Sequence, residues 1–256
     1  MKTTRYKMRF PASDPHALGQ DQAFFEIEES GNSQLVRFHD YAAIYKRPGL
    51  YEQLFYDRLK CCSPAKVAGI LLKVVGDYGH SVNELRVLDV GAGNGMVGEE
   101  IMKEGVARLV GLDIIPEAKI ALERDRPGLY DDYYVTDLTR THPEELEELR
   151  TWRFDAMLSV AALGFGDIPP LAFVTAFNLV ETPGWVAFNI KESFLDADDG
   201  SGFSDLVRHL IFDKYIQIHH MERYSHRVSI DGKKLFYYAI AAMKIRDFPP
   251  AQLQGA

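Results

Sequence analysis

From residue 86 onward, short apolar runs alternate with stretches of helical periodicity, and this alternation is the feature that most constrains the fold. The runs are short and rich in β-branched, aliphatic or aromatic residues, as expected of strands buried on both faces. They span residues 86–90, 108–113, 133–136, 154–160 and 185–190. Helices are expected between them, over residues 96–104, 116–124, 143–149 and 171–179. Such a pattern is typical of an α/β domain with a mainly parallel sheet.

The C-terminal part follows a different pattern. Residues 192–202 are rich in Asp, Gly and Ser, which indicates a mobile loop, and residues 203–212 resume helical periodicity. Two long strands are expected over 215–224 and 235–245, and Asp231-Gly232 marks a turn that makes them antiparallel. Residues 246–256 contain Pro249-Pro250 and predict a frayed tail. The spacing of Thr141 and Glu144 predicts a capping box before the helix at 143–149.

The segment before residue 86 differs in composition from the rest. Residues 24–28 and 34–38 flank Gly31-Asn32 and predict a hairpin, and aromatic-rich helical sequence follows from 40 to 59. A helix over 67–78 is expected to be the first of the sheet domain. We therefore expect an N-terminal extension and cap over 1–66, the α/β domain over 67–246 and a tail over 247–256.

Charge and cysteine content narrow the class of protein. Lys and Arg number 29 against 37 Asp and Glu, a formal charge of −8, which disfavours a nucleic-acid partner. Apolar stretches fall short of the roughly 18 residues that span a bilayer, and no apolar segment follows the basic first residues, so neither a membrane span nor a secretory signal is expected. Cys61 and Cys62 are adjacent and lie in no metal-binding spacing, which predicts reduced thiols in a cytoplasmic protein with no metal site.

The segment 87–98 runs from a buried strand into glycines and then into a helix. Gly93, Gly95 and Gly98 satisfy the G-x-G-x-x-G pattern of dinucleotide sites, so such a site must be considered. Asp89 argues against it, because a carboxylate two residues before the first glycine would repel the pyrophosphate that a helix N-terminus attracts. A ligand that carries an ammonium and a sulfonium, such as S-adenosylmethionine, would be attracted instead.

Residues 87–95, Val-Leu-Asp-Val-Gly-Ala-Gly-Asn-Gly, resemble motif I of the class I S-adenosylmethionine-dependent methyltransferases. Downstream, 109–116 resemble motif II, 135–138 motif III, 154–160 motif IV and 183–190 motif V, so the resemblance covers about residues 85–245. It implies a Rossmann-like seven-stranded methyltransferase sheet, an α/β fold with the last strand antiparallel, helices on both faces and an N-terminal helical cap. The stretches 158–166 and 222–232 are similar to small methyltransferases of the Williams-Beuren syndrome region type, which brings no substrate.

The resemblance implies S-adenosylmethionine as cofactor and assigns roles to single residues. Asp113 would bind the ribose hydroxyls and Asp137 the adenine amino group. Tyr41 and Tyr45 would close over the cofactor, where an aromatic face attracts a sulfonium. The cofactor-binding residues expected are Asp89, Gly91, Ala92, Gly93, Gly95, Asp113, Ile114, Asp137, Leu138, Ser159, Val160, Tyr41 and Tyr45. No catalytic residue is assigned, although His39 and His226 are candidate proton acceptors.

Missing motifs narrow the range of methyl acceptors that the sequence allows. No Asn-Pro-Pro-Tyr or Asp-Pro-Pro-Tyr follows the fourth strand, so amino groups of nucleic-acid bases are unexpected acceptors. The glutamate pair of protein-arginine methyltransferases is missing, and Ser159 stands where cation-dependent catechol enzymes place a metal-binding Asp. We therefore expect in-line methyl transfer to a small molecule, driven by alignment and exclusion of water, with the acceptor atom undetermined.

Three alternatives stay open: an NAD-dependent oxidoreductase of related fold, a cofactor-binding module without turnover, and a macromolecular methyltransferase. The loop at 192–204 is expected, together with Tyr41, Tyr45 and Phe165, to form a lid over a partly apolar acceptor.

Overall fold

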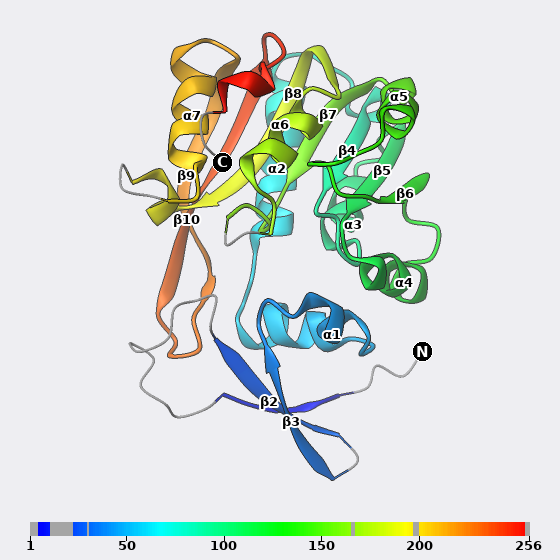
Figure 1. Ribbon diagram of the computed structural model, residues 1–256, viewed down its shortest axis with the longest axis vertical. Helices are drawn as coiled ribbons and strands as arrows, with labels where there is room; N and C mark the ends of the chain where they lie inside the picture. The colour runs from blue at the N-terminus through cyan, green and yellow to red at the C-terminus, as the bar shows by residue number, and fades with distance from the viewer. Residues whose placement is uncertain (1–4, 11–22, 30, 165–166, 197–199, 254–256) are drawn as a thin grey trace.

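The computed structural model describes residues 5–10, 23–29, 31–164, 167–196 and 200–253. Figure 1 shows a large α/β unit and, below it, a small cap built from the N-terminal strands and short helices. Phe165 lies outside the described residues, as do 197–199 of the expected lid.

The α/β unit is built on one seven-stranded sheet with the order β6-β5-β4-β7-β8-β10-β9. Its strands are β4 (Arg86–Val90), β5 (Arg108–Asp113), β6 (Asp132–Val135), β7 (Phe154–Ser159), β8 (Val180–Lys191), β9 (Ile216–Val228) and β10 (Lys234–Lys244). Neighbours from β6 to β8 pair in parallel, whereas β10 runs antiparallel to both β8 and β9. The predicted sheet with an antiparallel last strand is confirmed.

Helices cover both faces of this sheet. The helices are α2 (Ser63–Asp77), α3 (Met96–Met102), α4 (Pro116–Asp125), α5 (Pro143–Thr151), α6 (Pro170–Phe177) and α7 (Phe203–Phe212). Apolar side chains of α2 and α3 share one buried cluster with the sheet, and those of α5, α6 and α7 share another. Because alternate strand residues face opposite sides, β4, β5, β7, β8, β9 and β10 contribute to both clusters.

Two local predictions were wrong. Thr141 does not cap α5: its Oγ1 donates a hydrogen bond to the carbonyl of Asp137, and the N-cap residue is His142, which makes no side-chain cap bond. The tail from residue 246 is not frayed over its described part. Phe248 is 1% exposed and packs on Tyr215, and its backbone exchanges two hydrogen bonds with the side chain of Asn178. The buried ring of Phe248 therefore holds this segment in place. The prolines of the segment prevent a periodic pattern, so no sign of this order is readable in the sequence.

The cap consists of a three-stranded antiparallel sheet and two short helical segments. Its strands are β1 (Lys7–Arg9), β2 (Phe24–Glu29) and β3 (Asn32–Arg37), and its helices are α1 (Tyr41–Tyr45) and the π-helical segment η2 (Glu52–Arg58). The hairpin of β2 and β3 is confirmed, whereas β1 was not predicted because three residues carry no readable alternation.

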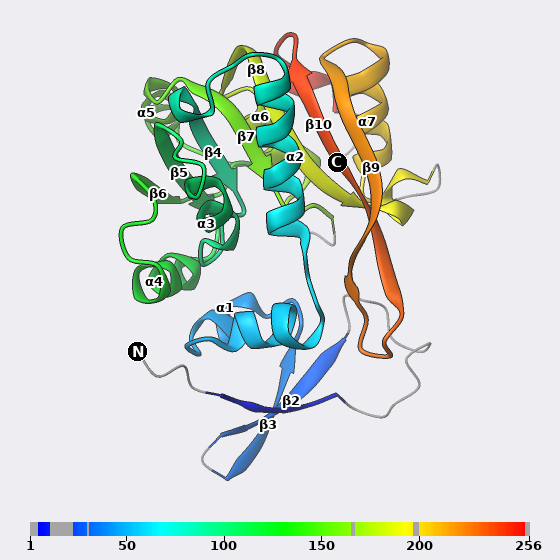
Figure 2. The same ribbon diagram turned by 180° about the vertical axis from the view of Figure 1, so that it is seen from behind.

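The cap is joined to the far edge of the sheet. Figure 2 shows the long β9–β10 ribbon twisting down toward the cap. There the N–H of Val228 donates to the carbonyl of Leu59, and Val228 and Ile230 pack on the apolar core of the cap. Segments from both ends of the chain therefore enclose the region between the cap and the carboxyl ends of the parallel strands.

Candidate functional site

A cavity of about 810 Å³, partly open to solvent, lies at the carboxyl ends of β4, β5 and β7 beneath the cap. Open α/β sheets bind their ligands at this end. We name it the strand-end cavity. Eight of the predicted site residues line it, namely Tyr41, Tyr45, Gly91, Asp113, Ile114, Asp137, Leu138 and Val160. The other five, Asp89, Ala92, Gly93, Gly95 and Ser159, do not line it and lie in or beside the glycine loop or at the end of β7.

The glycine loop after β4 has a conformation that side chains would disturb. Gly91 and Gly93 have φ values of +73° and +55°, in the left-handed region. A Cβ atom at Gly91 would lie 2.8 Å from that of Ala162, and one at Gly93 would collide with the hydroxyl of Tyr45. The cap tyrosine therefore lies directly against the loop at the point where a ligand would approach its backbone.

Asp113 at the end of β5 holds the glycine loop in place. Its Oδ2 accepts a hydrogen bond of 2.9 Å from the Gly93 N–H, and its Oδ1 accepts one of 2.9 Å from the Ile115 N–H. The side chain is 8% exposed, and burial raises the pKa of its carboxyl against the effect of these bonds. Each carboxylate oxygen retains acceptor capacity, so the residue can also receive hydroxyl groups from the cavity.

Asp89 is 1% exposed and is not among the residues that line the strand-end cavity. The hydroxyl of Tyr130 donates a 2.7 Å hydrogen bond to its Oδ2. Its Oδ1 is buried, and no described residue has hydrogen-bond geometry with it. Burial, aided by the charge of Asp113, raises the pKa of the Asp89 carboxyl to about 7. A cation brought near this buried oxygen would stabilise the ionised carboxylate, so contact of Asp89 with a cationic ligand group stays a prediction.

Asp137 lies in the turn after β6 and lines the cavity. Its Oδ1 accepts hydrogen bonds from the backbone N–H and the hydroxyl of Thr139, at 2.9 and 2.7 Å. These two bonds lower the pKa of the Asp137 carboxyl, so it is ionised at neutral pH. Contact of this carboxylate with an adenine amino group stays a prediction.

Three tyrosines of the cap form the roof of the cavity. Tyr41 and Tyr45 stack with ring centroids 6.2 Å apart, and Tyr45 and Tyr51 stack at 5.2 Å. Burial raises the pKa of all three hydroxyls, which therefore remain protonated at neutral pH. Tyr51 was not among the predicted site residues, because an aromatic stripe partly at helical spacing usually serves packing.

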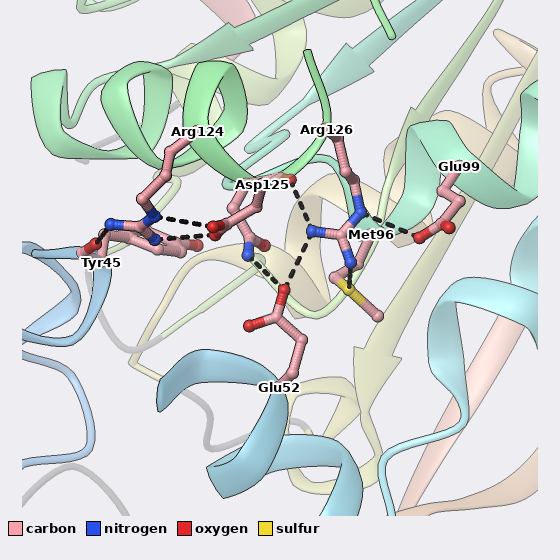
Figure 3. Close-up of polar contacts among 8 residues, drawn as sticks. Tyr45, Glu52, Met96, Glu99, Arg124, Asp125 and Arg126 are labelled. Atoms are coloured by element: carbon pink, nitrogen blue, oxygen red, sulfur yellow. Dashed lines mark hydrogen bonds and ion pairs between the residues drawn. The ribbon is translucent and has the colours of Figure 1, made fainter. Parts of the chain in front are cut away.

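A polar cluster fastens this roof to the sheet domain (Figure 3). Arg126, just after α4, donates to Glu52 of the cap, to Glu99 of α3 and to the backbone carbonyl of Asn94. Arg124 donates a 2.9 Å hydrogen bond to the backbone carbonyl of Tyr45. Sequence reasoning missed this cluster, because charged residues at a helix end are usually solvated and these partners are far apart in the chain.

A buried polar network shapes the turn after β7. Ala161 has a φ of +58°, and its N–H donates a 2.6 Å hydrogen bond to Oδ1 of Asn189. The amide nitrogen of Asn189 donates to the hydroxyls of Tyr224 and Ser63. His226 lies 2.5 Å from the Ser63 hydroxyl, and burial lowers the pKa of its imidazole to about 3. His226 is thus a neutral member of this network and a weak base, which argues against its expected role as proton acceptor.

The described parts of the expected lid, residues 192–196 and 200–204, pack against the sheet domain. Residues 192–195 form a 3₁₀ turn, and the ring of Phe194 lies against Gly164. Glu192 pairs with Arg223 of β9, and Phe203 enters the core at the start of α7. The described parts of this segment line neither the strand-end cavity nor the cavity next to it. The cap supplies the roof instead.

The part of the chain that the structure describes, residues 5–10, 23–29, 31–164, 167–196 and 200–253, contains neither a candidate metal centre nor a candidate membrane-spanning helix. Within those ranges, no group of three or more His, Cys, Asp or Glu side chains is arranged to hold a metal ion. None of the helices described is both long and apolar enough to cross a bilayer.

Solved structures of similar fold include three with TM-scores of 0.50 or more. A Thermoplasma acidophilum protein superposes with a TM-score of 0.51 at 15% identity, over 78% of this chain and 97% of that chain. Magnesium protoporphyrin IX methyltransferase from Synechocystis, solved with bound S-adenosylmethionine, gives 0.50 at 14%, over 71% and 79%. A Pyrococcus horikoshii protein proposed to be an RNA methyltransferase gives 0.53 at 13%, over 73% and 87%. At such low identity these likenesses establish the fold alone.

Comparison of the sequence itself is more specific. No curated protein matches it. Residues 88–188 match the family model described as a methyltransferase domain. This range begins in β4, contains the glycine loop, Asp113 and the turn after β7, and ends in β8. Residues 88–188 are therefore similar to a methyltransferase domain, and they lie within a Rossmann-like seven-stranded sheet.

Proposed function

We propose that this protein is an S-adenosylmethionine-dependent methyltransferase that acts on a small-molecule acceptor. The observation that carries the proposal is the pair of buried carboxylates at the glycine loop. Asp113 faces the cavity with acceptor capacity for hydroxyls, and Asp89 has an oxygen without a donor. Dinucleotide pyrophosphate would meet negative charge here, whereas a ligand with hydroxyls at one part and a cation at another matches both.

The residues of the chain bind and orient the cofactor and the acceptor, and they exclude water from the site. When bound, S-adenosylmethionine supplies a methyl group already activated by its sulfonium. Asp113, Asp137 and the glycine loop would hold the cofactor during this transfer. The tyrosine roof keeps water out and offers aromatic faces to a positive charge. Alignment supplies most of the rate enhancement in such a displacement.

A small acceptor is favoured by the closure of the site. The cap covers the strand-end cavity and is fastened at Glu52 and at the backbone of Tyr45. A polymer would need an open groove and, for nucleic acid, a basic surface, which the formal charge of −8 does not favour. The similarity to small methyltransferases of the Williams-Beuren syndrome region type is part of the proposal but names no acceptor.

Calorimetry separates the proposal from its alternatives. The protein is titrated with S-adenosylhomocysteine and, in parallel, with NAD. Binding of S-adenosylhomocysteine alone supports the proposal, and binding of NAD alone refutes it. Transfer of labelled methyl groups is then measured with fractions of a cell extract. Label in the small-molecule fraction supports a small acceptor, label in protein or nucleic acid contradicts it, and binding without transfer to any fraction indicates a module without turnover.

A further inference from the structure

A second cavity adjoins the strand-end cavity and lies between the cap and the β9–β10 ribbon. The two cavities share Tyr41, Tyr51, Ala161 and Asp167 in their walls. We name it the cap–ribbon cavity. Three of its eight remaining wall residues are aromatic, namely Phe38, Phe55 and Tyr237. A molecule held here would therefore lie next to whatever occupies the strand-end cavity.

Arg227 of β9 reaches this cavity from a buried position, with 7% of its surface exposed. Its Nη1 donates a 3.0 Å hydrogen bond to the carbonyl of Val228, and the guanidinium lies 6.0 Å from the ring centroid of Phe38. Among the described residues, no carboxylate lies within 4.0 Å of it. Arginine is almost never buried without a counter-ion, because removal of the charge from water is costly.

The other titratable groups around the cavity do not neutralise this charge. Asp167 pairs with His39, whose Nδ1 lies 3.1 Å from its Oδ2. Burial lowers the pKa of His226 to about 3 and raises that of the Cys61 thiol to about 11, so both are uncharged at neutral pH. Burial also lowers the pKa of Arg227 itself, which expresses the cost of its unpaired charge. An anion brought into the cavity would offset that cost.

We propose that the cap–ribbon cavity is the acceptor subsite of the methyltransferase and that Arg227 binds an anionic oxygen group of an aromatic acceptor. This inference rests on the proposed function. A guanidinium presents a planar fork of donors that matches a carboxylate or a phosphate, and the Nε and Nη2 donors of Arg227 have no partner among the described residues. The aromatic walls suit the ring of the acceptor, and the shared wall brings its nucleophile toward the strand-end cavity.

Benzoate, phenyl phosphate and neutral benzamide test the proposal on protein saturated with S-adenosylhomocysteine. Binding is followed by calorimetry and by the shift in Tm. We expect benzoate or phenyl phosphate to bind at least tenfold more tightly than benzamide, and the preferred anion tells a carboxylate from a phosphate. Equal binding of benzamide, or binding of none of the three, overturns the inference. Failure of S-adenosylhomocysteine itself to bind refutes the proposed function instead.

Variants then locate the charge. Arg227→Gln should reduce affinity for the anion at least tenfold and leave affinity for S-adenosylhomocysteine within twofold. The matched control is Arg223→Gln, which alters an exposed arginine of the same strand and should leave anion affinity unchanged. If Arg227→Gln does not fold, Arg227→Lys is used, and it should lose at least fivefold in anion affinity because lysine lacks the fork. Unchanged anion affinity in the folded Arg227 variant overturns the assignment.

Discussion

Asp89→Asn is expected to stabilise the free protein at alkaline pH and to weaken its binding of the cofactor. The replacement has the same shape and still accepts the hydrogen bond from Tyr130, but it cannot ionise. Asp89 is buried, and its pKa is raised from 3.8 to about 7, chiefly by burial. In the folded protein this carboxyl therefore ionises about three pH units higher than in the unfolded chain, and a bound cation would favour its ionised form.

The sign and size of this change in stability follow from the linkage between proton binding and folding. The pKa of Asp89 is higher in the folded than in the unfolded protein. Its contribution to the free energy of unfolding is therefore fully present below pH 3.8 and is lost as the pH rises to about 7. A difference of about three pKa units corresponds to about 4 kcal/mol. Asp89→Asn should thus gain as much as about 4 kcal/mol over the wild type at pH 8, and much less at pH 5.

Asp89→Asn should weaken the binding of S-adenosylhomocysteine, although it stabilises the free protein. With a pKa of about 7, roughly a tenth of Asp89 is ionised at pH 6 and nine-tenths at pH 8. The wild type should therefore bind S-adenosylhomocysteine, which retains the ammonium, about tenfold more tightly at pH 8 than at pH 6. Asp89→Asn should bind weakly at both. Adenosine lacks the cation, so its affinity should be almost the same for both proteins.

Urea unfolding at pH 5 and pH 8, with calorimetry at pH 6 and pH 8, measures these quantities. A stability difference between the two proteins that is equal at both pH values would refute the raised pKa. Equal affinity of both proteins for S-adenosylhomocysteine at pH 8 would show that Asp89 does not meet the cation. An equal loss of adenosine affinity would indicate a damaged loop.

Three further predictions concern the loop, the β7 turn and the cap. Asp113→Ala should weaken S-adenosylhomocysteine binding by about 1 to 3 kcal/mol in calorimetry and lower Tm, because the Gly93 N–H also loses its acceptor; unchanged affinity in the folded variant would contradict the ribose assignment. Asn189→Ala should lower the free energy of unfolding by about 1 to 3 kcal/mol in urea, because it leaves the Ala161 N–H unpaired, and an unchanged midpoint would count against this. Arg126→Gln should speed S-adenosylhomocysteine dissociation several-fold in stopped-flow measurements, whereas Arg108→Gln, at an exposed site, should not.

The parallel strands and the glycine loop could be predicted because their signals are local. A strand buried on both faces must be apolar along its length, and the loop after β4 requires glycines at left-handed positions such as Gly91 and Gly93. Asp113 could be placed because it ends the next strand of the sheet. These features depend on neighbours within a few residues or on the fixed order of a parallel sheet.

The cap contacts could not be predicted because they join residues distant in the sequence. Arg126 and Glu52 are 74 positions apart, and each alone has the composition of a solvated surface. The same holds for Phe248, whose partner Asn178 is 70 positions away. At Thr141 a local pattern predicted a contact that does not form. The sequence there has the spacing of a capping box, but the Thr141 hydroxyl donates to a carbonyl of the preceding turn. Local patterns compete with tertiary contacts that the sequence does not display.

Asp89, near the strand-end cavity, and Arg227, in the wall of the cap–ribbon cavity, have one property in common. Each residue is a buried ionisable group that lacks an ion-pair partner among the described residues, and their charged forms are opposite in sign. In the free protein both are unfavourable, as the shifted pKa values of the two side chains indicate. A cationic cofactor beside Asp89 and an anionic acceptor beside Arg227 would relieve them separately, under one tyrosine roof. Stability given up in the free state would then favour the loaded complex, the usual relation between function and stability at binding sites.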